Sequence, residues 1–384
     1  MPSAEAGNGT YLFAHPGAEL FGSDRMMLES ARGLTRDGAR VVVVLPETGP
    51  LIPALIEAGA EVVIVPMLVL RKALLRPSGW LKLISDSVRG MHAAWRLLSG
   101  TRPQALYTST ITIPQWPLIA RLRGIPSVTH VHEAESSASR LLNLALYAPH
   151  LAADALVVNS DFSLGALTST LPQLGRRARV VYNGVASPDN ARLPRDHIDT
   201  LRVLYVGRLS PRKGVRDAIV AVDRLRRSGV DARLSILGSA FTGYEWFERE
   251  LHDLAAGMDD AVRFLGFQPD VWSVIAEHDV LVVPSRIDEP FGNTAVEGVL
   301  AKRPVVASDT SGLREAAGGY KATQLVAPGS PEAIAAALRN VVDRWGELRG
   351  RLEADAKQAT ERHAPTRYQE AIRTAVADVA RPRG

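Results

Sequence analysis

The sequence contains no cysteine. A disulfide framework, a thiolate nucleophile and a cysteine-based zinc site are therefore excluded. No uncharged apolar run reaches about 18 residues, which argues against a membrane-spanning helix. The amino terminus, MPSAEAGNGT, lacks the charged and then apolar regions of a signal peptide, so we do not expect one. These absences favour a cytoplasmic protein.

Two signatures of nucleotide chemistry are also missing. The pattern G-x-x-x-x-G-K-[ST] does not occur, which disfavours a P-loop ATPase. No Asp-x-Asp pair occurs either, which removes the usual divalent-metal clamp for a nucleotide diphosphate. If the chain binds a diphosphate, we expect fixed cationic side chains in place of a metal ion.

The composition is that of an ordinary globular protein. Of 384 residues, 46% are hydrophobic and 22% are charged, and this length suggests two or three domains. The 45 Lys and Arg residues against 41 Asp and Glu residues give a net charge of +4. This mild excess points to anionic ligands or surfaces. We expect no nucleic-acid partner.

Short β-rich runs alternate with amphipathic stretches along most of the chain. Each run is nearly continuous Val, Ile and Leu, which indicates strands buried on both faces of a parallel sheet. This pattern therefore predicts a doubly wound α/β domain over residues 1–185. Its expected strands are 11–15, 39–45, 61–66, 105–109, 127–132 and 155–159.

The alternation is interrupted at 186–200, a polar stretch with two prolines that we interpret as a linker. It resumes in a second α/β domain over 201–364, and we expect a helix over 365–384 that docks back on the first domain. Open parallel sheets bind ligands beyond their strand carboxyl ends, so two facing sheets predict a cleft for two substrates. The expected strands of the second domain are 201–206, 233–237, 262–265, 280–284 and 304–308.

Two acidic residues flank a predicted helix start. Glu289 lies on a loop in the sequence E-P-F-G, and Glu297 is expected in the first turn of a helix beginning near Asn293 or Thr294. Both carboxylates can then face one cleft, where the helix start offers free backbone N–H groups. Alternatively, Thr294 and Glu297 form a capping box and bond only their own helix.

Two cations follow the first strand of the second domain. Arg208 and Lys213 lie on the loop after the strand that ends at Gly207. An Arg fork and a Lys point charge suit a diphosphate. The alternative is that these are solvated surface cations, as neighbouring Arg212 also suggests.

The first domain offers two weaker signals. Gly17 and Gly22 follow its first strand and would let backbone amides approach a phosphate, although the same residues fit a capped helix start. His130 and His132 end another strand on one side of it, but no third ligand is spaced to complete a metal site. One histidine reaching the cleft is the preferred interpretation, and no metal site is expected.

The segment from Arg71 to Arg102 is strongly basic. It holds seven cations and one acid together with Trp80 and Trp95. A basic helix with interfacial tryptophans is typical of contact with an anionic membrane surface or an anionic acceptor. A solvated helix face with core tryptophans is the equally weighted alternative.

The motifs E-P-F-G-N-T-A-V-E (289–297), V-G-R-L-S-P-R-K-G (206–214) and V-Y-N-G-V (181–185), with the glycine loop after the first strand, resemble glycosyltransferase family 4. The motifs follow the family order over almost the whole chain. The resemblance implies the GT-B fold, in which two Rossmann-like domains face each other. It further implies a retaining, metal-independent transferase that needs no cofactor and uses a nucleotide sugar as donor.

The resemblance also implies roles for individual residues. Arg208 and Lys213 would hold the donor diphosphate, Glu297 the ribose, and Glu289 the sugar hydroxyls. His132 would face the transferred sugar or the acceptor. The remaining donor-binding positions would be Gly22, Gly207, Gly266, Phe267, Phe291, Gly292, Asn293 and Thr294. The chain departs from the family pattern at 238–240, which lack the usual Gly-x-Gly-Pro, and at Ser311, which replaces a glycine.

The acceptor implied by the resemblance is a glycan, a lipid-linked glycan or a small molecule, in the synthesis of cell-envelope glycan, polysaccharide or glycoconjugate. The departing phosphate would accept the acceptor proton, so neither Glu289 nor Glu297 is assigned as a nucleophile. Two alternatives stay open: a nucleotide-sugar epimerase of the same architecture, and a catalytically silent partner that binds nucleotide sugar.

Overall fold

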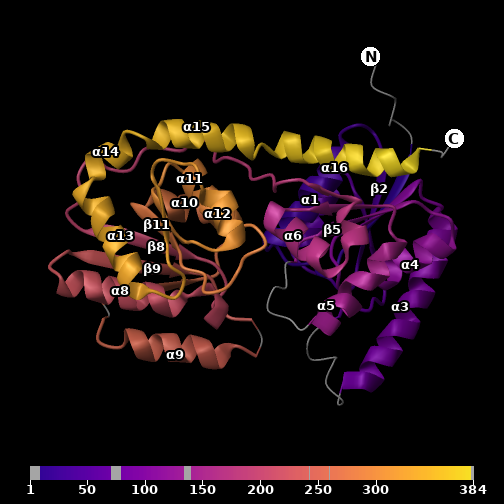
Figure 1. Cartoon of the computed structure of the whole chain (residues 1–384), viewed down its shortest axis with the longest axis horizontal. Coiled ribbons are helices and arrows are strands. Elements are labelled where there is room, and N and C mark those ends of the chain that lie inside the picture. The colour runs from indigo at the N-terminus through magenta and orange to yellow at the C-terminus, as the bar shows by residue number, and fades with distance from the viewer. Residues whose placement is uncertain (1–8, 71–78, 134–139, 242, 259, 382–384) are drawn as a thin grey trace. The chain divides into compact units, whose positions relative to one another are not determined.

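The structure is a computed structural model, and it describes residues 9–70, 79–133, 140–241, 243–258 and 260–381. The chain divides into two compact units (Figure 1), one formed by Met1–Gly184 with Pro365–Gly384 and the other by Val185–Ala364. The expected linker, 186–200, belongs to the second unit and has neither helix nor strand. Arg195 anchors it there through an ion pair of 2.8 Å with Asp279.

The first unit contains a seven-stranded parallel sheet in the order β3-β2-β1-β4-β5-β6-β7, within the described residues. Its strands form because runs such as Val41, Val42, Val43 and Val44 bury both faces of the pleat between helices. The strands are β1 (Thr10–Ala14), β2 (Arg40–Leu45), β3 (Glu61–Ile64), β4 (Ala105–Thr108), β5 (Ser127–Val131), β6 (Ala155–Val158) and β7 (Ala178–Val180).

Helices cover this sheet, and the carboxyl-terminal helix is one of them. Tyr368 on that helix shares a hydrogen bond of 2.8 Å with Ser30, and a Cβ at Gly33 would lie 2.9 Å from the Gln369 side chain. The helices are α1 (Gly22–Thr35), α2 (Leu51–Glu57), α3 (Trp80–Thr101), α4 (Gln115–Leu122), α5 (Arg140–Tyr147), η3 (Ala148–Ala152), α6 (Asp161–Thr170), α7 (Pro172–Gly175) and α16 (Pro365–Ala380). Helix α16 therefore packs closely on α1 in the first unit.

In the part of the second unit that the structure describes, six strands form a parallel sheet in the order β10-β9-β8-β11-β12-β13. Its strands are β8 (Leu201–Val206), β9 (Ala232–Leu237), β10 (Val262–Gly266), β11 (Val280–Val283), β12 (Val305–Ser308) and β13 (Thr323–Val326). Its helices are η4 (Pro211–Lys213), α8 (Val215–Arg227), α9 (Glu245–Ala255), α10 (Val271–Ala276), α11 (Asn293–Leu300), α12 (Ser311–Ala317), α13 (Pro331–Asp343), α14 (Trp345–Arg349) and α15 (Leu352–Arg362).

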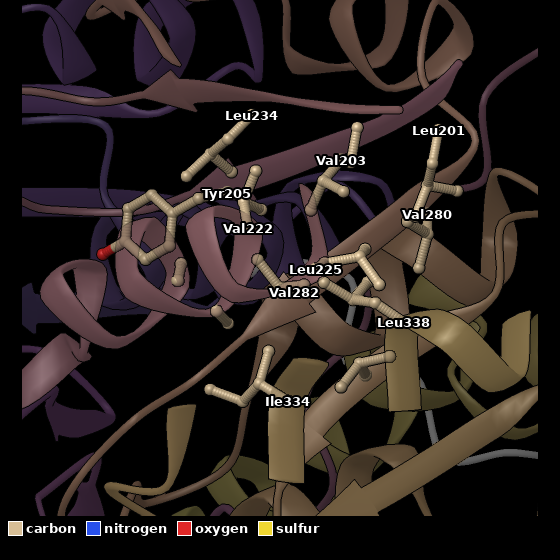
Figure 2. Packing of buried hydrophobic residues seen from close by; sticks show 14 of the residues in the cluster. Leu201, Val203, Tyr205, Val222, Leu225, Leu234, Val280, Val282, Ile334 and Leu338 are labelled. Atoms are coloured by element: carbon tan, nitrogen blue, oxygen red, sulfur yellow. The ribbon is translucent and has the colours of Figure 1, made fainter. Parts of the chain in front are cut away.

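A closely packed core holds α8 and α13 against the central strands of this sheet. Figure 2 shows side chains of β8 and β11 meeting those of the two helices. Val222 and Leu225 come from α8, and Ile334 and Leu338 come from α13. Burying each such side chain contributes about 1.5–3 kcal/mol. This core therefore keeps the ends of the central strands rigid, and the loops that follow these strands begin at fixed positions.

The fold class predicted from the sequence is confirmed, and the predicted strands match the observed ones to within about two residues. Two edge strands, β7 and β13, were not predicted. Both are short and only partly buried, so they lack the continuous apolar pattern of central strands. Among the described helices, none has the length and apolar character needed to cross a bilayer.

Candidate functional site

The candidate site of the second unit lies where the strand order of its sheet reverses. Strands β8 and β11 are neighbours in the sheet, although β9 and β10 come between them in the chain. At such a reversal, the loops after the two strands run in opposite directions and leave room for a ligand at the carboxyl edge. The loop after β8 carries Arg208 and Lys213, and the loop after β11 carries Glu289.

These two loops are fixed to each other. Gly214 has φ of 70°, and a Cβ there would lie 1.8 Å from the carbonyl oxygen of Pro284 at the end of β11. The Arg286 backbone N–H donates to the Arg212 carbonyl at 2.8 Å. The Arg286 guanidinium also binds both oxygens of buried Asp217, at 2.6 and 2.7 Å, which raises the pKa of Arg286. These contacts hold the backbone of the loop that carries the cations rigidly against the loop after β11.

Lys213 and Glu289 meet directly across the two loops. The Lys213 ammonium Nζ lies 2.8 Å from Glu289 Oε1, which also accepts a hydrogen bond of 2.8 Å from Ser285 Oγ. Arg212 is more distant, at 3.8 Å from Glu289 Oε2. Glu289 is only 6% exposed. A carboxylate this deeply buried is stable only when it is paired and hydrogen-bonded, as it is here.

Two contacts position Arg208, one at its guanidinium and one at its backbone carbonyl. Its guanidinium carbon lies 3.9 Å from the ring centroid of Phe241, in the geometry of a cation–π contact. The Tyr205 hydroxyl donates to the Arg208 carbonyl at 2.9 Å. Burial, with the charge of Glu289 as a second cause, raises the pKa of Tyr205. Tyr205 therefore keeps its proton and its role as a donor.

The turn predicted for Glu297 is wrong, while the predicted helix start is confirmed. Helix α11 begins at Asn293 with Gly292 as N-cap, so Glu297 is its fifth residue and lies in the second turn. A capping box requires the acid at the third helical position, which Ala295 occupies. The capping-box alternative is therefore excluded. Glu297 is nevertheless buried, on the helix that follows the Glu289 loop.

Helix α12 packs tightly against the Glu289 loop. A Cβ at Gly312 would lie 2.1 Å from the Glu289 carbonyl oxygen, and one at Gly292 would lie 2.5 Å from Leu313 Cδ2. Ser311 donates to Asp288 Oδ1 from its hydroxyl at 2.8 Å and from its amide at 3.2 Å. The serine that departs from the family pattern therefore fastens the loop to this helix.

The other predicted donor-binding residues of this unit lie around the same sheet edge. A Cβ at Gly238 would lie 1.9 Å from the Gly207 carbonyl oxygen, and the Gly238 amide donates to the Gly266 carbonyl at 2.8 Å. Gly207, Gly238 and Gly266 thus bring the ends of β8, β9 and β10 together. Phe267 beside them is exposed, whereas Phe291 is buried with its ring against His363. Asn293 and Thr294 are the first two residues of α11.

The strand order of the first sheet reverses between β1 and β4, and a buried polar triad lies there. His15 Nε2 lies 2.7 Å from Asp24 Oδ1, and His15 Nδ1 lies 3.1 Å from Ser109 Oγ. Asp24 Oδ2 also accepts from the Phe21 amide at 2.8 Å, so the triad holds the start of α1. The pairing of His15 with Asp24 was not predicted from the sequence, although both residues flank the glycine loop after the first strand. Gly22 is the exposed first residue of α1.

His132 lies just after β5 in the first unit. Its Nε2 is buried and has no hydrogen-bond partner among the described residues, and its ring centroid lies 3.9 Å from that of His130. Burial, reinforced by nearby His15, lowers the pKa of His132 to about 3. His130 is itself engaged, with Nδ1 2.6 Å from the Tyr107 hydroxyl. His132 is therefore neutral at physiological pH, with one ring nitrogen uncommitted.

Two family models match the chain. The model described as Glycosyltransferase Family 4 matches residues 22–187, and the model described as Glycosyl transferases group 1 matches residues 200–344. Among curated proteins, glycogen synthase of Mycobacterium tuberculosis is 30% identical over 259 residues, covering 63% of this chain and 60% of that protein. The 2-deoxystreptamine glucosyltransferase of Streptomyces kanamyceticus is 29% identical over 259 residues, covering 59% and 64%. The chain thus matches less than two thirds of either relative.

Solved structures share the whole fold. The crystal structure of Anabaena HepE in complex with UDP and glucose has a TM-score of 0.79 at 20% identity, covering 96% of this chain and 99% of that one. A glycosyltransferase from Rickettsia africae has a TM-score of 0.79 at 16% identity, covering 98% and 100%. With two parallel-sheet Rossmann-like units and a family model matched in each, the chain belongs to glycosyltransferase family 4 and has the GT-B fold.

Proposed function

We propose that the protein is a retaining, metal-independent glycosyltransferase that moves a sugar from a nucleotide-diphosphate sugar to a hydroxyl acceptor. One observation carries the proposal. Lys213 is fixed 2.8 Å from buried Glu289, on the loops that leave the strand-order reversal of the second sheet. Arg208 follows the same strand as Lys213. The HepE structures contain UDP or UDP-glucose and share the fold of this chain, which supports a nucleotide sugar as the proposed donor.

The proposed chemistry follows from where charge develops. Cleavage of the anomeric C–O bond leaves positive charge on the sugar and negative charge on the diphosphate. Arg208 and Lys213 stabilise the departing diphosphate, and a preorganised group of this kind is typically worth about 10²–10³ in rate. Because two fixed cations serve this purpose, the proposal needs no metal ion and no cofactor.

The acids act as ligands of the donor. Glu289 binds sugar hydroxyls together with the backbone of Phe291, Gly292 and Asn293, and Glu297 binds the ribose. Glu289 already binds a lysine and a serine hydroxyl, which supports a positioning role and argues against a nucleophilic one. The departing phosphate accepts the acceptor proton, and the acceptor attacks from the same face, so the anomeric configuration is retained.

Two residues of the first unit, His132 and Gly22, have proposed roles of their own. A neutral imidazole with a free ring nitrogen can bind a sugar hydroxyl without adding charge near the developing oxocarbenium ion, which supports this role for His132. Gly22, at the start of α1, leaves backbone amides accessible to a phosphate. Gly207, Gly266, Phe267 and Thr294 complete the proposed donor site.

The proposed acceptor is a glycan, a lipid-linked glycan or a small molecule, in cell-envelope glycan, polysaccharide or glycoconjugate synthesis. We place the protein in the cytoplasm, with peripheral contact to the anionic inner face of the membrane through the segment from Arg71 to Arg102. Residues 71–78 of that segment lie outside the described residues, and α3 is its described part.

Product analysis tests the proposal. The purified protein is incubated with UDP-, GDP-, ADP- and TDP-sugars, with and without acceptors, in the presence of a chelator. We expect one donor to yield a glycosylated acceptor whose NMR spectrum shows the anomeric configuration of the donor. Release of free sugar or an isomer without acceptor would indicate an epimerase, and inverted product or a need for added metal would contradict the mechanism.

A further inference from the structure

Helix α3 carries large apolar side chains on a face turned away from its own unit. Leu81 is 86% exposed, and Ile84 and Val88 are each 61% exposed. Met91 and Trp95 continue the series, with spacings of three and four residues. At 3.6 residues per turn, these side chains lie within an arc of about 100° and extend over about 20 Å.

The adjacent face of the helix packs against the unit itself. Gly90, Ala94 and Leu98 are buried, and a Cβ at Gly90 would lie 2.8 Å from the Leu68 amide nitrogen. Helix α3 also packs against α4 (Figure 1). The guanidinium of Arg123, which follows α4, lies 4.8 Å from the ring centroid of Trp95. Because these contacts fix the rotation of the helix, the apolar arc cannot turn inward.

A row of basic residues runs along one side of the apolar arc. Lys82, Arg89 and Arg96 recur every seven residues, and all three are exposed. The acid of the helix, Asp86, is paired with Lys82 at 2.9 Å. An exposed apolar arc bordered by a basic row is the pattern of a helix lying in a membrane interface, where apolar side chains enter the acyl boundary and cations meet anionic headgroups.

We propose that this face of α3, defined by Leu81, Ile84, Val88, Met91 and Trp95 with the Lys82–Arg89–Arg96 row, docks on an anionic lipid bilayer. The inference deepens the membrane contact of the proposed function and rests on it. Insertion of the arc sets the depth of the helix, and the basic row selects anionic lipid. Neither role requires residues 71–78.

Vesicle sedimentation with the full chain tests this surface. The probes are phosphatidylcholine vesicles with and without an equal part of phosphatidylglycerol. Two double variants are compared with wild type: Ile84→Gln with Val88→Gln, and Arg89→Gln with Arg96→Gln. Glutamine keeps good helix propensity, and circular dichroism verifies folding. The control pairs Ile56→Gln with Arg176→Gln, both exposed in the same unit.

We expect wild type and the control to bind the anionic vesicles, and each α3 variant to lose about tenfold or more in partitioning. Raising the salt concentration should weaken wild-type binding. Nucleoside-diphosphate binding, measured in parallel, should be unchanged in both α3 variants, which separates this inference from the donor site. The proposal would be overturned if wild type showed no preference for anionic vesicles, or if the Ile84/Val88 variant bound them like wild type. If wild type sediments as a dimer and the Ile84/Val88 variant as a monomer, this face would bind a second copy of the chain and not a bilayer.

Discussion

Lys213 and Glu289 form a direct ion pair of 2.8 Å between the loops that follow β8 and β11. The lysine side chain is 31% exposed, whereas the carboxylate is almost fully buried. Removing the lysine would leave a buried carboxylate with the Arg212 guanidinium 3.8 Å away. The pair therefore orients the ammonium toward the carboxyl edge of the sheet and is costly to break.

Lys213→Ala should lower turnover by about 10²–10³, because the departing diphosphate loses a preorganised cation. Steady-state kinetics with the preferred donor measure the loss. Arg212→Ala is the matched control, with an expected loss under about tenfold, because that side chain is 47% exposed and farther from Glu289. Equal losses in the two variants, or full activity in Lys213→Ala, would refute the assignment of Lys213.

Gly214→Ala should destabilise the second unit far more than Gly229→Ala. Both glycines have positive φ, so each alanine costs about 1–2 kcal/mol of backbone strain. At Gly214 the new Cβ would also meet the Pro284 carbonyl at 1.8 Å, whereas no atom of the described residues outside the immediate chain neighbours lies within 4 Å of one at Gly229. Urea denaturation should give a loss of at least about 3 kcal/mol at Gly214. Similar losses at both positions would show that the two loops are not in close contact.

Phe241→Ala should lower kcat/KM by about 3- to 30-fold, since the ring supports the Arg208 guanidinium at 3.9 Å. Phe241→Tyr keeps a ring face and should stay within about twofold of wild type. Trp246→Ala removes another exposed aromatic side chain of the same region and serves as the control. Wild-type kinetics in Phe241→Ala would mean that Arg208 is positioned without the ring.

The folded protein should lose stability as the pH falls below about 6.5, partly through His132. Its pKa is lowered to about 3 by burial, so the unfolded chain binds a proton that the folded chain does not. The stabilisation is fully present above the unfolded pKa and declines by about 1.4 kcal/mol per pH unit as the pH falls toward 3.

Comparison with His132→Gln isolates this contribution. The difference in unfolding free energy between wild type and variant should shift by about 2 kcal/mol between pH 7 and pH 5, in favour of the variant at the lower pH. Denaturant titrations at the two pH values provide the measurement. The histidines remote from His132 are present in both proteins and cancel, whereas the pKa of His130, lowered by burial first and by His132 second, stays low through its burial. Parallel pH dependences would show that His132 is not held neutral by the fold.

The sequence was sufficient for the architecture of both units. Runs such as Val280, Leu281, Val282 and Val283 are buried in central strands, and their continuous apolar pattern identifies them without further information. The edge strands β7 and β13 include polar or exposed residues such as Arg179 and Gln324, so no such pattern marks them. The other two edge strands, β3 and β10, carry apolar residues such as Val62, Val63 and Phe264 in short runs and were predicted.

The candidate site was predicted in part. Lys213 and Glu289 could be placed because each follows a predicted strand. The contact between Phe241 and Arg208, and that between His15 and Ser109, join residues far apart in sequence, so no local spacing encodes them. Glu297 was placed in the first turn of its helix, but a helix that begins at Asn293 makes it the fifth residue, and 3.6 residues complete a turn.

Isothermal titration calorimetry with UDP, GDP, ADP and TDP measures whether the edge defined by Arg208, Lys213 and Glu289 binds a diphosphate. We predict that one of these nucleotides binds wild type and that Lys213→Ala and Arg208→Ala each weaken the affinity by about tenfold or more, as loss of a charge-assisted contact requires. Arg176→Gln, in the first unit, should bind like wild type. Absence of binding for all four nucleotides, or unchanged affinity in both alanine variants, would contradict the proposed donor site.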